Sequence, residues 1–239
     1  MRILLALSIT FCSIAWYPID ITNPEVQRPK RKSPKPKAQV KKKLLALTFD
    51  ACEQNYPSYF DNRILNIILE NRLPTTLFIS GRFLKRNYKM VETLSYYPFI
   101  EIENHSYSHD ILTDKSPDFL IDDITRNNRL IEKATRKRPR YFRFPAGLYN
   151  QDTLALVTSL GLKTVHWSFE SGDPNRDMTA EKLINRVLRR VRDGSILIFH
   201  INRRGWHTAD ALPAIIHHLK TRGYDFVLLK DMPKLPYIK

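Results

Sequence analysis

The ten residues LLALTFDACE, numbered 44–53, decide the fold of this chain, and they follow directly on a run of lysines. Their apolar character through Phe49 predicts a buried strand that ends at a carboxylate, Asp50. Parallel α/β folds place catalytic groups at the C-terminal ends of their buried strands. Asp50 is therefore a candidate catalytic residue. The alternative is a plain strand end, with Asp50 capping the helix that follows.

From residue 44 onward, short apolar runs alternate with apolar residues at helical spacing, which predicts alternating strands and helices. Asn150 and Thr179 are typical helix N-caps, and Gly161 and Gly223 follow helix ends. This alternation predicts one parallel α/β domain, either a barrel or an open sheet. The expected strands are 44–49, 76–79, 99–103, 140–144, 163–168, 195–200 and 225–229, and the expected helices are 59–71, 119–135, 152–160, 180–191 and 208–222.

The charge of the chain is concentrated near its N-terminus. The 239 residues carry a net charge of +15, which raises the possibility of a nucleic-acid partner. Nine lysines and arginines and no acid lie within residues 28–43 alone, and no nucleic-acid-binding motif is present. Because the charge belongs to a proline-rich tail, we do not expect a nucleic-acid partner. A hydrophobic content of 43% is typical of a globular protein.

The first 43 residues predict export. Arg2 precedes an apolar run over residues 3–16, shorter than the ~20 residues of a membrane span. Residues 1–17 are therefore interpreted as a signal peptide or an N-terminal membrane anchor, and we expect a periplasmic, secreted or outward-facing anchored protein. Residues 18–43 form a Pro/Lys-rich basic linker. It is either a solvated tether or a contact to an anionic envelope surface.

Four titratable residues follow separate expected strands, namely Asp50, His105, Asp173 and His200. In a barrel those strand ends converge on one rim, so the four side chains can share one pocket. His105 and His109 are also four residues apart, so a helical turn would direct both imidazoles toward one divalent metal ion. Ser106 and Ser108 can steady that backbone by local hydrogen bonds. The alternative is that the four-residue spacing of His105 and His109 arises by chance and binds no metal.

In their order, five segments resemble the motifs of the polysaccharide deacetylase family, also called the NodB-homology domain or carbohydrate esterase family 4. The resemblance covers about residues 44–229, and it implies a single seven-stranded (β/α) barrel within a domain spanning 44–239. The segments are Thr48-Phe-Asp50, His105-Ser-Tyr-Ser-His109, Arg143-Phe-Pro-Ala-Gly147, Glu170-Ser-Gly-Asp173 and Leu197-Ile-Phe-His200.

The resemblance also implies a reaction, the hydrolytic removal of acetyl groups from a polysaccharide or oligosaccharide such as a chitin-like or cell-wall glycan. N-acetyl groups are favoured over O-acetyl groups. Asp50 would act as general base and His200 as general acid, protonating the departing amine. Arg143 would orient the base, and Asp173 would both partner Arg143 and tune the catalytic histidine.

By the same resemblance, His105 and His109 bind a divalent metal, with zinc favoured and cobalt or nickel as alternatives. Most of the family has a second aspartate after the base as a third ligand, whereas this chain has Ala51. Either water and Asp50 complete the metal shell, or Cys52 or Glu53 does so. A thiolate ligand would favour zinc.

For the substrate, the resemblance implies that a backbone N–H near Tyr149 stabilises the oxyanion that forms when water attacks the acetyl carbonyl. Pro174 stands where many relatives have an apolar tryptophan, so Trp167, Phe169 or Trp206 is expected to supply that wall, with ordinary packing as the alternative. A second function remains open because of Ala51. The chain could be a catalytically impaired relative that only binds glycan.

Overall fold

The computed structural model of this chain describes residues 42–53 and 56–233. The predicted signal or anchor, 1–17, and nearly all of the basic linker lie outside the described residues, so both stay predictions. Within the part that the structure describes, no helix is both long enough and apolar enough to cross a membrane.

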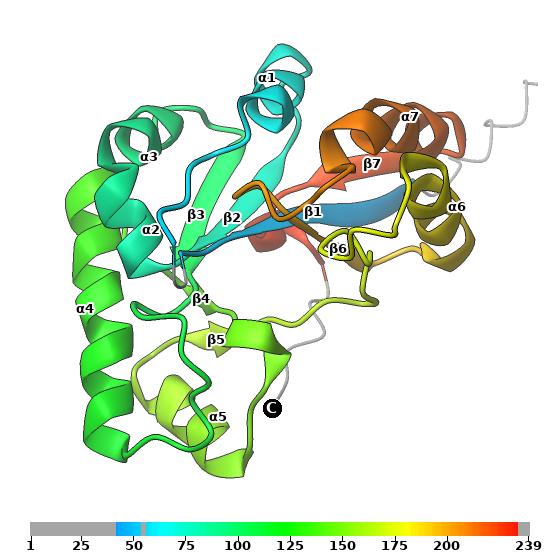
Figure 1. The fold of residues 1–239 in the computed structure, drawn as a ribbon. Coiled ribbons are helices and arrows are strands. Elements are labelled where there is room, and N and C mark those ends of the chain that lie inside the picture. Colours follow the sequence, from blue (N-terminus) through cyan, green and yellow to red (C-terminus); the bar gives the residue numbers. More distant parts are fainter. Residues whose placement is uncertain (1–41, 54–55, 234–239) are drawn as a thin grey trace, which may run out of the picture. The chain divides into compact units, whose positions relative to one another are not determined.

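A parallel sheet of seven strands forms the centre of the domain (Figure 1), and each predicted strand is present. The predicted bounds of 195–200 are identical to those observed, whereas the runs at 140–144 and 163–168 pair over only two residues each. The strands are β1 (Lys43–Ala51), β2 (Thr75–Ile79), β3 (Ile100–Asn104), β4 (Tyr141–Phe142), β5 (Lys163–Thr164), β6 (Ser195–His200) and β7 (Tyr224–Val227).

The sheet is curled, in the order β5-β4-β3-β2-β1-β6, and β7 pairs with the first half of β1. Beyond β5 a single bridge, between Phe169 and Leu197, joins the chain to β6. The α/β class is confirmed, but a complete seven-stranded barrel is not. The shortness of β4 has a local cause, because the Glu103 carboxyl group accepts the backbone N–H groups of Arg140 and Tyr141 at 2.7 and 2.8 Å. Those donors are then not available to extend the strand ladder.

Helices lie around the outside of the sheet (Figure 1). Asn150 and Thr179 cap two of them through side-chain oxygens, as predicted. Two short helices, α2 and α3, were not predicted, because their six and seven residues carry too little periodicity to be recognised. The helices are α1 (Asn62–Glu70), α2 (Gly81–Arg86), α3 (Tyr88–Leu94), α4 (Pro117–Thr135), α5 (Gln151–Ser159), α6 (Ala180–Arg190) and α7 (Thr208–Thr221), with short 3₁₀ turns η1 (Pro145–Gly147) and η2 (Leu229–Asp231).

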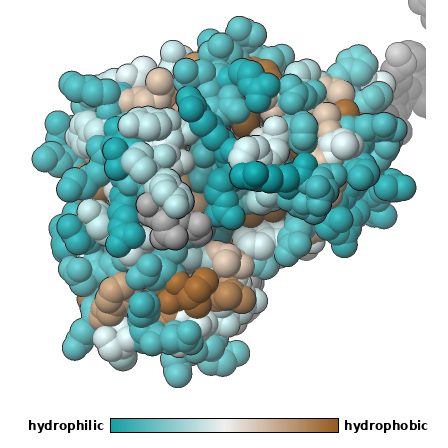
Figure 2. All heavy atoms as spheres, viewed as in Figure 1, coloured by the Kyte–Doolittle hydropathy of each residue, from teal (hydrophilic) through white to brown (hydrophobic). Residues whose placement is uncertain are grey.

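Side chains of β1 alternate between two environments, because successive residues of a strand point to opposite faces. Leu47 and Phe49 belong to the large apolar core that includes residues of α1 and α7. Ala46 belongs to a smaller cluster, with Phe78 and Ile196, enclosed by the curled sheet. Asp50 shares the side of Ala46, so the catalytic candidate faces the inside of the curl. The face drawn in Figure 2 is mostly hydrophilic, with its largest apolar area in the lower part of the view.

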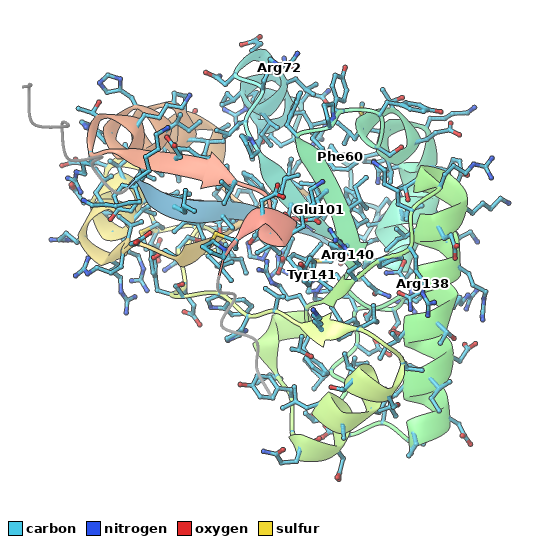
Figure 3. All side chains as sticks on the ribbon, turned by 180° about the vertical axis from the view of Figure 1, so that it is seen from behind. Phe60, Arg72, Glu101, Arg138, Arg140 and Tyr141 are labelled. Atoms are coloured by element: carbon cyan, nitrogen blue, oxygen red, sulfur yellow. The ribbon has the colours of Figure 1, made fainter. Side chains whose placement is uncertain are left out.

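Polar side chains also lie at the opposite, N-terminal ends of the strands. Glu101, Arg140 and Tyr141 are close together there (Figure 3), and Glu101 and Arg140 form an ion pair of 2.8 Å. A cavity of about 230 Å³ adjoins them, and Glu103 lies at its inner side, 3% exposed. Burial, and then the neighbouring Glu101, raise the pKa of Glu103 to about 8.

This raised pKa predicts a loss of stability with increasing pH. The usual value is 4.5, so between about pH 4.5 and 8 the unfolded chain ionises Glu103 while the folded chain keeps it protonated. The free energy of unfolding should therefore fall across this range, by on the order of a few kcal/mol. In Glu103→Gln the amide oxygen can still accept both N–H groups, and most of this fall should disappear. Urea unfolding at pH 5, 6.5 and 8 measures it, with the exposed Glu132→Gln as control. An unchanged pH dependence in Glu103→Gln would refute the assignment.

Candidate active site

The predicted site residues converge on one cavity of about 240 Å³ at the C-terminal ends of the strands. Asp50 and His200 are register partners in the pairing of β1 with β6, which places these two side chains next to each other. The lining consists of Asp50, His105, His109, Ala146, Trp167, Glu170, Ser171, Gly172, Asp173, Pro174, Ile198, His200 and Arg204.

A buried ion pair fixes Asp50. The Nη1 of Arg143 lies 2.7 Å from Asp50 Oδ1 and also donates to Thr48 Oγ1 at 2.9 Å. The Arg143 side chain is fully buried, and its guanidinium lies 4.0 Å from the centre of the Phe78 ring, a favourable cation–π contact. Burial alone would raise the pKa of Asp50, but Arg143, His105 and His200 together hold that pKa below its usual value. Asp50 is therefore ionised.

Beside Asp50, the two histidines present neutral imidazoles. His105 Nδ1 lies 2.8 Å from the backbone oxygen of Arg143 and must donate its proton to it. The lone pair is then on Nε2, which lies 3.5 Å from Asp50 Oδ2. The His109 ring is 4.8 Å away, centre to centre. Burial lowers the pKa of His105, and lowers that of His109 to about 3, so both rings are in the form that ligates metals.

The loop that carries both histidines is not the predicted helical turn. Ser106 and His109 have φ of 61° and 63°, in the left-handed region. Two backbone N–H groups, those of Tyr107 and Ser108, donate to the carboxylate of Asp123 on α4, and Ser106 Oγ accepts from the N–H of His109. These hydrogen bonds compensate for the unusual backbone. The local role of the serines is confirmed, but Asp123 was missed, although an acid on the apolar stripe of a helix is a signal for it.

At the other side of the cavity, Asp173 holds His200. The predicted pairing of Asp173 with Arg143 is wrong, because the Arg143 guanidinium pairs with Asp50 instead. Its Oδ1 lies 3.0 Å from His200 Nδ1, and its Oδ2 accepts the backbone N–H of His200 at 2.7 Å and the Thr208 hydroxyl at 2.9 Å. Burial works to lower the pKa of His200, but the Asp173 carboxylate outweighs it and raises that pKa above its usual value. Since Nδ1 faces the carboxylate, Nε2 is the nitrogen left to exchange a proton with a substrate.

The residues after Asp50 are turned away from the cavity lining. Ala51 is buried in the large apolar core. The Cys52 thiol accepts from Asn202 Nδ2 at 3.4 Å, and burial raises its pKa to about 11. Glu53 forms an ion pair with Arg86, which lowers the pKa of Glu53. Thus neither predicted additional ligand lies beside the histidines.

Over residues 42–53 and 56–233, no group of three or more His, Cys, Asp or Glu side chains is positioned to hold a metal ion. The donors that are present fit an ion held by two histidines, with Asp50 as the nearest carboxylate. Such a site leaves several coordination positions open to water and substrate, and it binds metal more weakly than a three-ligand site.

Of the predicted substrate contacts, only Trp167 lines the cavity. Tyr149 packs against the rings of Phe144 and His166, outside the lining, and Trp206 donates from Nε1 to the backbone oxygen of Pro174 at 3.2 Å, beside a separate depression. Their predicted roles in substrate binding stay predictions.

The fold and the cavity together define an α/β protein with a buried carboxylate, a carboxylate-bound imidazole and two further histidines at one end of a curled parallel sheet. The chain belongs to the polysaccharide deacetylase family, which matches residues 37–165. The family predicted from the five motifs is thereby confirmed.

Known relatives agree with this assignment. The chain is 29% identical over 196 residues to the peptidoglycan N-acetylmuramic acid deacetylase of Bacillus subtilis (strain 168), covering 81% of this chain and 72% of the relative. A family 4 acetyl xylan esterase from Clostridium thermocellum, solved with a cobalt ion, has a TM-score of 0.70 and 30% identity, covering 80% and 90% of the two chains.

One similar structure is a pseudoenzyme. A carbohydrate esterase family 4 pseudoenzyme from Bacillus anthracis has a TM-score of 0.71 and 27% identity, covering 80% of this chain and 66% of that one. A mutant of that protein is described as having restored enzymatic activity. Membership of the family therefore includes both active and inactive proteins.

Gly205 offers a test of how Asp173 is positioned. A Cβ at Gly205 would lie 2.6 Å from Asp173 Oδ2 and 2.7 Å from the backbone oxygen of His200, and it would also meet the Thr208 hydroxyl. We expect Gly205→Ala to displace Asp173 from His200 and lower kcat/KM for deacetylation about 10- to 100-fold, with a loss of ~1–3 kcal/mol in unfolding free energy. Arg203→Ala, at a loop position outside the lining, is the control. Full activity in folded Gly205→Ala would show that this contact does not matter.

Proposed function

We propose that this protein is a metal-dependent glycan deacetylase that hydrolyses N-acetyl groups of a cell-wall or chitin-like polysaccharide. The observation that carries the proposal is the placement of an ionised carboxylate, Asp50, and a carboxylate-bound imidazole, His200, on neighbouring strands around one cavity. Amide hydrolysis needs a group that accepts a proton from water and another that donates one to the departing amine. Asp50 and His200 supply that pair.

The chain's own groups have separate roles in the proposed reaction. Asp50, kept ionised and oriented by Arg143, accepts the proton of the attacking water. His200, kept protonated and oriented by Asp173, gives its proton to the amine through Nε2. Trp167 gives the cavity an apolar wall for the acetyl methyl group. His105 and His109 would hold the divalent ion, zinc or alternatively cobalt or nickel, which would polarise the acetyl carbonyl as a Lewis acid.

A second candidate is a glycan-binding relative without catalysis. Ala51 favours it, since alanine supplies no ligand, and so does the likeness to a family 4 pseudoenzyme. The retention of Asp50, Arg143 and the two histidines argues for the enzyme, because a protein that only binds glycan has no need of an acid–base pair.

Export is part of the proposal, because a cell-wall glycan lies outside the cytoplasm. Arg2 and the apolar run over residues 3–16 support it, and the basic linker 18–43 would contact anionic envelope polymers. Fractionation of cells that produce the full chain, followed by N-terminal sequencing, tests this. Recovery of the uncleaved chain in the cytoplasm would reject export.

Acetate release distinguishes the enzyme from the binder. Protein stripped of metal and resupplied with zinc, cobalt or nickel should release acetate from acetylated chitooligosaccharides or peptidoglycan. Asp50→Asn should reduce the rate by about 10²–10⁴-fold, the usual contribution of a general base. Asp122→Asn, with a carboxylate 69% exposed on α4, is the control and should keep full activity. Absence of acetate with every metal and glycan would favour the binder.

The pH–rate profile follows from the two shifted groups. Activity should rise as Asp50 ionises, below the usual carboxylate pKa, and should fall as His200 loses its proton, above the usual histidine pKa. The result is a bell-shaped pH–rate profile with a broad plateau between the pKa of Asp50 and the pKa of His200. Asp173→Asn should move the alkaline limb to lower pH, because it removes the charge that raises the pKa of His200. A flat profile from pH 5 to 9 would reject these roles.

A further inference from the structure

Arg204 is a charged residue of the active-site cavity that the proposed reaction does not use. Its half-buried side chain belongs to the lining, together with Asp50, His109 and His200. The other two cationic groups at this site each have a carboxylate partner, Asp50 for Arg143 and Asp173 for His200. Within the described residues, no carboxylate lies at ion-pair distance from Arg204. Its guanidinium contacts the thiol of Cys52, 4.0 Å from Nη1.

The loop that carries Arg204 is held firmly against the site. Asn202 Nδ2 donates to the backbone oxygen of Cys52 at 2.6 Å, and the N–H of Trp206 donates to the backbone oxygen of Asp173 at 3.2 Å. Gly205, between them, packs so closely on Asp173 that no side chain fits there. The backbone of Arg204 is therefore held at the cavity before any ligand arrives, which reduces the entropy that binding must overcome.

An arginine without a carboxylate partner, fixed at the edge of a cavity, is suited to bind an anion. Its planar donors match a carboxylate in two parallel hydrogen bonds. The acids of the lining do not cancel this charge. Asp50 and Asp173 are each paired within the site, and Glu170 is exposed, so its field is screened by solvent.

We propose that Arg204 binds a carboxylate on the sugar that carries the scissile N-acetyl group, so that the site selects N-acetylmuramic acid over N-acetylglucosamine. Muramic acid bears its carboxylate on a lactyl ether at the carbon next to the acetamido group. One ring can therefore present the amide to His105, His109 and Asp50 and the carboxylate to Arg204 within the same cavity. This inference rests on the proposed function, and it makes Arg204 a specificity-determining residue.

The test compares two substrates that differ only in the carboxylate. One is a glycan of alternating N-acetylglucosamine and N-acetylmuramic acid with free lactyl carboxylates, and the other is the same glycan after reduction of those carboxylates to alcohols. Acetate release gives kcat/KM for each, and calorimetry gives the affinity of the metal-free protein for each. The variants are Arg204→Gln, Arg204→Lys and, as a control for charge, Arg203→Gln.

We expect the wild-type protein to prefer the acidic glycan by about 10- to 100-fold, the usual effect of a charge-assisted hydrogen bond. Arg204→Gln should lose this preference because its kcat/KM falls on the acidic glycan and stays unchanged on the reduced one. Arg204→Lys should keep part of the preference, and Arg203→Gln should keep all of it. A wild-type protein that treats both glycans alike overturns the inference, and so does an equal loss on both in Arg204→Gln.

Failure of the proposed function would be seen separately. If no acetate is released from either glycan, the affinities still decide the role of Arg204. Tighter binding of the acidic glycan that disappears in Arg204→Gln supports the inference for a glycan-binding protein. Equal affinities for the two glycans refute it.

Discussion

The buried ion pair between Asp50 and Arg143 is the interaction on which the rest of the site depends. Its two residues come from β1 and from the end of β4, strands that are not neighbours in the sheet, so the pair spans the inside of the curl. Removing one partner of such a pair typically costs ~3–5 kcal/mol, because the other charge is left buried. The same contact therefore holds the sheet curled, keeps Asp50 ionised and, through the backbone oxygen of Arg143, sets the tautomer of His105.

An apolar layer separates two polar regions inside the curled sheet. Ala46, Phe78, Val165 and Ile196 belong to that layer. The ion pair and the histidines lie at the C-terminal ends of the strands, and Glu101, Glu103 and Arg140 at the N-terminal ends. Because water is excluded from the layer, charges on either side interact strongly with their neighbours. This arrangement explains why large pKa shifts occur at both ends of one small domain.

Those parts of the fold that depend on regular periodicity could be predicted from the sequence. Parallel strands bring their C-terminal ends together, so the convergence of Asp50, His105 and His200 followed from strand positions alone. Contacts that depend on one particular backbone geometry could not be predicted. The left-handed residues around His109, held by Asp123, replace the helical turn, and the hydrogen bonds of Glu103 shorten β4. Such left-handed residues and side-chain-to-backbone hydrogen bonds leave no periodic signal in the sequence.

Cys52 follows β1 directly and contacts Asn202, in the loop after β6, through hydrogen bonds to its backbone oxygen and its thiol. It is the one cysteine among the described residues, 2% exposed, and burial keeps its thiol protonated at neutral pH. Because only the thiolate reacts, this sulfur is protected from oxidation and disulfide exchange while the loop containing Asn202 stays in place. Because of the same protection, the reactivity of Cys52 reports on the opening of this loop. The rate at which a thiol reagent modifies it measures how often that loop lifts from the edge of the sheet.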